Sequence, residues 1–80
     1  MAQDNNIEAI FYPTDITLDL AGPEGNVFYI MGLCKKLFCQ LDIADEWPRY
    51  YNECRKGYYK DVLAISRRWF GFNYINAPFR

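Results

Sequence analysis

Histidine is absent from the 80 residues, and with it the side chain that most often serves as a general base or zinc ligand near neutral pH. The three cysteines, Cys34, Cys39 and Cys54, include no Cys-x-x-Cys pair, and their spacing matches no zinc motif. A serine or cysteine nucleophile would need a lysine or carboxylate as its base. We therefore expect no metal site, no cofactor and no enzymatic activity.

Long apolar runs are also absent, because no stretch approaches the roughly 18 residues that a membrane-spanning helix needs. The segment "AQDNNIEA" that follows Met1 is too polar for the apolar region of a secretory leader. An odd number of cysteines without a pairing motif fits reduced thiols. These absences predict a cytoplasmic protein that makes no membrane contact.

Apolar and aromatic residues, by contrast, are abundant. They make up 51% of the chain and include seven Tyr, six Phe and two Trp. A chain of 80 residues forms a single domain, and a domain of this size buries only a small fraction of its surface. This much apolar material therefore predicts exposed apolar patches and self-association. We expect a disordered N-terminus over residues 1–6 and one domain over residues 7–80.

Hydrophobic spacing predicts an α+β fold in the order β(β)αααβ. Strict alternation over residues 16–20 indicates a half-buried strand, and a weaker strand over 7–12 would join it through a hairpin at 13–15. Apolar residues at helical spacing predict three helices, and a short strand ends the fold. The ranges are 27–41, 45–56 and 58–70 for the helices and 72–77 for the last strand. We expect a small two- or three-stranded antiparallel sheet covered by the helices.

The segment "AGPEGN" joins the second strand to the first helix and invites comparison with a phosphate-binding loop. It contains neither G-x-G-x-x-G nor G-K-[ST], proline lacks an N–H donor, and the Glu24 carboxylate would repel a phosphate. Asn26 is a favourable N-cap for the helix that follows. We interpret the segment as a structural turn formed by Gly22, Pro23, Gly25 and Asn26.

Charge is divided unevenly along the chain. Residues 1–46 hold eight acids and two bases, a net charge of −6, whereas residues 47–80 hold seven bases and two acids, a net charge of +5. Such asymmetry predicts an interaction surface, and Arg and Tyr are enriched among the residues that dominate binding energy at interfaces. The predicted partner-binding residues on the second and third helices are Arg49, Tyr51, Arg55, Tyr58, Arg67 and Arg68.

Three apolar residues of the first helix, Phe28, Tyr29 and Leu33, lie off its core stripe. A helix with a second apolar face is either buried on two sides or paired with another chain. These residues form the predicted self-association seam of a homo-oligomer.

Two other functions remain open at this point. The runs "WPRYYNECRKGYYK" and "SRRWFGFNY" mix bases with aromatic residues, as nucleic-acid-binding surfaces do. An oligomer could also sequester a nucleotide between its subunits. Against the first alternative, most of these rings occupy core positions at helical spacing.

The run "ITLDLAGPEGNVFYIMG" resembles the start of small uncharacterised proteins encoded by tailed phages and prophages, in which a short strand leads through a Gly-Pro-Asp/Glu-Gly-Asn corner into a helix. The resemblance implies a phage-encoded accessory protein in the cytoplasm of the infected bacterium. It would bind and modulate or inhibit a host macromolecule, such as a protein of a defence system. The matching residues are Gly22, Pro23, Glu24, Gly25, Asn26, Phe28, Met31, Gly32, Gly57 and Tyr59.

Overall fold

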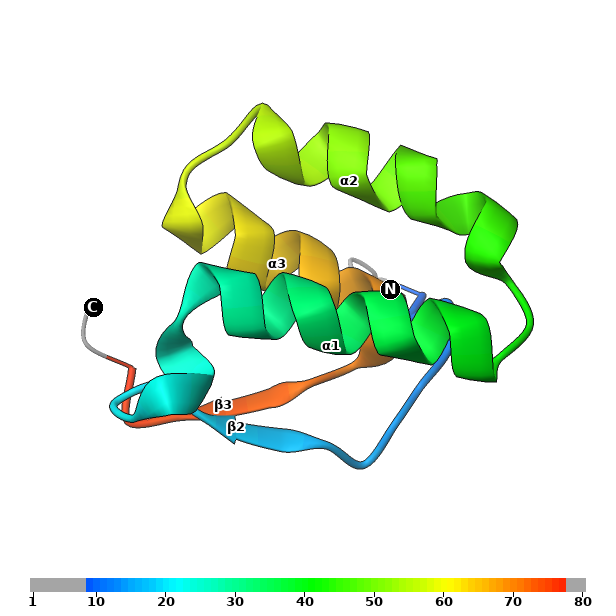
Figure 1. The fold of residues 1–80 in the computed structure, drawn as a ribbon. Coiled ribbons are helices and arrows are strands. Elements are labelled where there is room, and N and C mark those ends of the chain that lie inside the picture. The colour runs from blue at the N-terminus through cyan, green and yellow to red at the C-terminus, as the bar shows by residue number, and fades with distance from the viewer. Residues whose placement is uncertain (1–8, 78–80) are drawn as a thin grey trace, which may run out of the picture.

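The computed structural model describes residues 9–77 as a small α+β fold with three helices and a two-stranded sheet. Figure 1 shows α1 and α3 lying over the sheet, with α2 stacked on their far side. The predicted fold class and order of helices are confirmed, whereas the predicted tail over residues 1–6 lies outside the described residues. The elements are β2 (Thr17–Asp19), η1 (Pro23–Gly25), α1 (Val27–Gln40), η2 (Ala44–Glu46), α2 (Trp47–Arg55), α3 (Tyr59–Phe70) and β3 (Asn73–Ile75).

The sheet is parallel, so the prediction of an antiparallel sheet is wrong. In its register Leu18 of β2 lies opposite Tyr74 of β3. The reason is the number of helices between the strands. The chain reverses direction at the start of each of the three helices and again between α3 and β3. These four reversals leave β3 running in the same direction as β2 (Figure 1).

The predicted strand over residues 7–12 is not found where the structure describes it. Residues 7 and 8 lie outside the described part of the chain, and residues 9–12 form no strand and no hairpin with β2. This segment instead covers the end of α3. Its backbone donors meet the carbonyls of the last helical turn, which have no partner within a helix, through the hydrogen bonds Phe11 N to Arg68 O, Tyr12 N to Trp69 O and Thr14 N to Phe70 O.

The core lies where the apolar stripes of the three helices meet. Phe38 of α1 is fully buried and packs against four rings with centroid separations of 5.1 to 6.0 Å. Most of these pairs are edge-to-face, the arrangement that the ring quadrupole favours. The rings belong to Trp47, Tyr50, Trp69 and Phe70. Much of the aromatic content is therefore buried in the core.

No helix among residues 9–77 is both long and apolar enough to cross a membrane.

Candidate functional site

The corner before α1 is a 3₁₀ turn whose polar side chains form hydrogen bonds with nearby backbone N–H groups. The Glu24 carboxylate accepts a hydrogen bond from the backbone N–H of Asp19 at 2.8 Å. The Asn26 side chain caps α1 by accepting from the N–H of Phe28 at 2.7 Å. A Cβ on Gly25 would lie 2.1 Å from the carbonyl oxygen of Leu20. With its carboxylate and its cap turned inward, the corner sets the position of α1 and offers no cradle for a phosphate.

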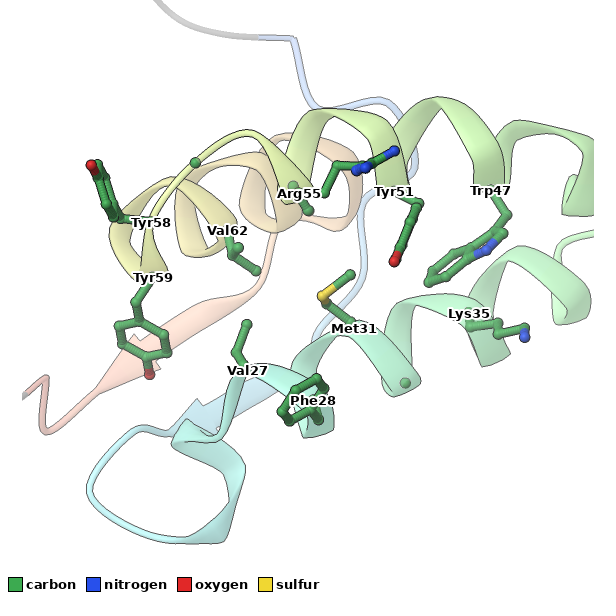
Figure 2. Close-up of a pocket in the computed structure, with 13 residues that line it drawn as sticks. Val27, Phe28, Met31, Lys35, Trp47, Tyr51, Arg55, Tyr58, Tyr59 and Val62 are labelled. Carbon is green, nitrogen blue, oxygen red and sulfur yellow. The ribbon is translucent and has the colours of Figure 1, made fainter.

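An apolar groove of about 590 Å³ runs between α1 and α2 and reaches the loop before α3 (Figure 2). It lies in the size range of binding pockets in proteins. One wall comes from α1, the other from α2, and the start of α3 closes one end. The large side chains of the two walls are Phe28, Met31 and Lys35 on α1, and Trp47, Tyr51 and Arg55 on α2.

Helical spacing explains why these side chains share a groove. Positions 28, 31 and 35 follow one edge of α1, and positions 47, 51 and 55 follow one edge of α2, because residues three or four apart lie one above the other. Tyr50 and Cys54 point toward the core and are buried between the helices, with Cys54 at the floor of the groove. In Figure 2, Trp47 and Tyr51 extend from α2 toward α1. The aromatic wall of the groove is therefore the flank of the stripe that builds the core.

The groove carries positive charge only. Lys35 places its ammonium 5.6 Å from the centre of the Trp47 ring, a cation–π contact inside the groove. Arg55 lies on the opposite helix and has no ion-pair partner among residues 9–77. No Asp or Glu lines this groove. An apolar surface flanked by two cations is suited to a partner that is apolar at its centre and acidic at its edges.

The thiol nearest the groove is not chemically activated. Cys54 lines the groove floor with only 2% of its surface exposed, and burial raises the pKa of its thiol. Burial likewise raises the pKa of the Cys34 thiol to about 11, opposed by hydrogen bonds with Tyr50 and Ser66. Because the thiolate is the nucleophile, a raised pKa disfavours the reactive form of both groups.

Ser66 completes this buried polar cluster at the centre of the three helices. Its hydroxyl and that of Tyr50 are 2.7 Å apart, and both side chains are fully buried. Paired in this way, the two hydroxyls avoid the cost of burying a polar group without a partner. The cluster joins α1, α2 and α3 and serves the fold.

The six predicted partner-binding residues do not form one surface. Tyr51, Arg55 and Tyr58 come together in the groove. Arg49 instead lies 5.7 Å over the Trp69 ring and 3.9 Å from the Glu46 carboxylate. The remaining two, Arg67 and Arg68, lie on α3 away from the groove.

Arg67 and Arg68 have different surroundings although they are adjacent in sequence. Arg68 lies 5.5 Å over the ring of Phe11 in the N-terminal segment. Arg67 lines a separate hollow beside Lys60 and Tyr74. Successive residues on a helix point about 100° apart, which separates the two guanidinium groups. Arg68 lines another hollow together with Arg49 and Glu53. The predicted basic residues are therefore divided among separate hollows.

The three residues of the predicted self-association seam do lie together. Phe28, Tyr29 and Leu33 line a shallow hollow on the outer face of α1, with Lys36 at its edge. Gly32 borders both this hollow and the groove. Phe28 also belongs to both surfaces, so the seam and the groove are neighbours on α1.

Sequence reasoning missed the contribution of Met31, Trp47 and Lys35 to the groove. The first two fall on predicted core stripes and are in fact half-buried at the edge of the core. The sequence signal for the groove was Gly32 inside a helical pattern, because a helix position without a side chain leaves the backbone accessible.

Within residues 9–77, no group of three or more Cys, Asp or Glu side chains is placed to hold a metal ion. Comparison of the chain with protein-family models, curated proteins and solved structures finds no match. The resemblance to phage proteins therefore stays a prediction, and the function has to be inferred from the groove.

Proposed function

We propose that the protein is a non-enzymatic binding protein that uses the groove between α1 and α2 to occupy a surface of a macromolecular partner. As a phage-encoded accessory protein it would thereby modulate or inhibit a host protein. The observation that carries the proposal is the exposure of large rings at an apolar groove. Phe28 is 79% exposed and Tyr58 is 86% exposed, although burying such rings in a core would be more favourable than leaving them in water.

The composition of the groove supports protein binding. Trp, Tyr and Arg are the residues that dominate binding energy at protein interfaces, and the groove contains Trp47, Tyr51 and Arg55. Contiguous apolar surface that stays open to water is a recurrent mark of an interaction site. Burial of the Cys54 thiol at the groove floor raises its pKa, which fits a surface that binds without reacting.

Site-specific photocrosslinking tests the proposal. A photoreactive phenylalanine analogue replaces Tyr58, and for comparison Gln40, which is exposed on α1 and lines no hollow described above. In infected or expressing cells, position 58 should trap one protein reproducibly, with nuclease treatment leaving the product unchanged. The trapped protein is then purified and its binding to Tyr51→Ala and Arg55→Glu variants measured, both expected to bind at least about tenfold more weakly. Equal trapping from position 40 would contradict the proposal.

Nucleic-acid binding is the second candidate, favoured by the cations and aromatic rings that share the groove. Separation of Arg49, Arg67 and Arg68 from that groove counts against it, since a single strand needs a continuous basic track. Titration of a fluorescent single-stranded oligonucleotide at several salt concentrations decides between the two. A steep linear fall of log affinity with log salt would favour nucleic acid.

A further inference from the structure

Gly32 is a costly residue whose presence the fold itself does not explain. It lies in the middle of α1 and is exposed, and a Cβ added to it would meet nothing within 4 Å. Glycine inside a helix is less stable than alanine because it loses more backbone freedom on folding. Gly25 and Gly57, by contrast, are pressed against neighbouring atoms of this chain. Because Gly32 has no side chain, the backbone of α1 is exposed at this position, and an outside molecule can approach it closely.

The position of Gly32 connects it to the groove. It lies on the α1 wall, four residues after Phe28 and three before Lys35, so it shares one edge of the helix with both. We propose that the groove binds an acidic amphipathic helix of a partner protein, whose backbone crosses α1 closely at Gly32. This inference rests on the proposed function and specifies the partner's chemistry.

The length of the groove suits two turns of a helix. Its α1 wall extends from Val27 to Lys35, about 12 Å at 1.5 Å per residue, or roughly two helical turns. A helix in a groove anchors itself through side chains at i, i+3, i+4 and i+7, which span nearly the same distance. Met31, Trp47 and Tyr51 offer the apolar contacts for those anchors.

Charge selects the acidic helix over other occupants. Lys35 and Arg55 stand on opposite walls, so carboxylates on both flanks of a bound helix would each find a cation. A basic helix would be repelled by both. A second copy that placed its own groove on this one would bring the same cations face to face, because a two-fold interface pairs a surface with itself.

A displayed peptide library tests this choice. The peptides have about 16 residues, apolar positions at i, i+3, i+4 and i+7, and Glu, Gln or Lys at the flanking positions. Selection on the full chain should enrich Glu on both flanks. Enrichment of Lys, or no preference among the three, would overturn the inference. The best peptide is then synthesised with a fluorophore for affinity measurement.

Gly32→Ala separates binding from folding. The substitution should raise Tm by about 4 °C by improving helix propensity, yet weaken binding of the selected peptide at least about tenfold because the methyl group blocks the close approach. Asn52→Ala on the exposed face of α2 is the matched control, since it also improves helix propensity and lies outside the groove. It should raise Tm without changing affinity. Unchanged affinity in Gly32→Ala would refute the close approach.

Two further comparisons locate a failure. Leu33→Glu changes the seam hollow but not the groove, and it should leave peptide affinity unchanged. If no peptide is enriched while the crosslinker at position 58 still traps a protein, the acidic-helix inference is wrong and the proposed function stands. If peptides are selected but the crosslinker traps nothing in cells, the groove binds helices and the proposed cellular function is wrong.

Discussion

At the scale of single residues, the corner before α1 depends on one glycine. A Cβ at position 25 would lie 2.1 Å from the Leu20 oxygen, a backbone atom that cannot move without disturbing the end of β2. We expect Gly25→Ala to lower the free energy of unfolding by about 2 kcal/mol or more, as overpacking does. Urea denaturation followed by tryptophan fluorescence measures the change.

Gly22→Ala is the control for this prediction. The nearest atom to a Cβ there is 4.0 Å away, and its φ of −110° is open to any residue. Removing a glycine at a compatible position stabilises a protein slightly by restricting the unfolded chain. Destabilisation of both variants to the same degree would show that the corner tolerates no side chain for some reason other than the Leu20 contact.

The buried thiol of Cys34 makes stability depend on alkaline pH. Burial raises its pKa to about 11 in the folded chain, whereas the unfolded chain ionises at the ordinary value of 9.0. As the pH rises above 9, the unfolded state loses its proton first, so the free energy of unfolding falls until the pH passes 11. The expected slope from this group is about 1 kcal/mol per pH unit.

Urea titrations under reducing conditions at several pH values from 8 to 10.5 measure that slope. Cys34→Ala should flatten it, most clearly between pH 9 and 10, while burial of Cys54, Tyr50 and Tyr74, which raises the pKa of each, maintains a dependence of the same sign. The slope is the informative quantity, because truncating a buried side chain also lowers stability at every pH. A slope that is the same in the variant would contradict the assignment to Cys34.

At the scale of elements, the N-terminal segment acts as a cap for α3. The hydroxyl of Thr14 donates to the Phe70 carbonyl at 2.7 Å, beside the backbone N–H of the same residue. Thr14→Val keeps the shape and removes the hydrogen bond, so we expect a loss of about 1 kcal/mol in the free energy of unfolding.

Thr17→Val provides the matched control for Thr14→Val. Thr17 is exposed on β2, and valine favours strands at least as well as threonine. Chemical denaturation of both variants should show destabilisation of the first alone. Equal effects would mean that the segment over residues 11–14 adds nothing to the end of α3.

The helices and the sheet differ in how much the sequence reveals of them. Residues at helical spacing show which side of α1 faces the core, because that pattern depends only on near neighbours. The direction of β3 depends on how many times the chain reverses between the two strands. Residues 9–12 of the strand predicted over 7–12 lie where they do because they pair with carbonyls at the end of α3. Such long-range partners leave no periodic signal.

The groove was predictable only in part for a similar reason. Tyr51 and Arg55 on α2 and Tyr58 just before α3 follow from their predicted exposure, and they do meet there. Arg49 and Arg68 were grouped with them by charge, but aromatic rings of distant segments hold them elsewhere. Met31 and Trp47 share the core stripe with buried residues, and their half-exposed position at the groove depends on how α1 packs relative to α2.

At the scale of the whole molecule, the seam on α1 predicts reversible self-association. Phe28, Tyr29 and Leu33 place apolar surface beside Lys36, and this hollow is separate from the core. Sedimentation velocity over a range of micromolar concentrations should show a monomer–dimer exchange in the wild type. Leu33→Glu should shift it to the monomer, because burying a carboxylate in the seam is costly.

Gln40→Glu adds the same charge at an exposed position outside the seam and should leave the exchange unchanged. If the wild type sediments as a monomer at every concentration, the prediction that the seam mediates self-association is wrong. Dissociation of both variants would indicate a general effect of negative charge.

The parallel pairing of β2 with β3 has a consequence for how the protein is made. Leu20 donates its backbone N–H to the carbonyl of Ile75, so residues far apart in the chain must meet before the sheet exists. On the ribosome, α1, α2 and α3 can each form as they emerge, but the backbone N–H and C=O groups along the edge of β2 stay unpaired until the last strand has been translated. A stalled or truncated product that ends before Asn73 would therefore be prone to aggregation and proteolysis.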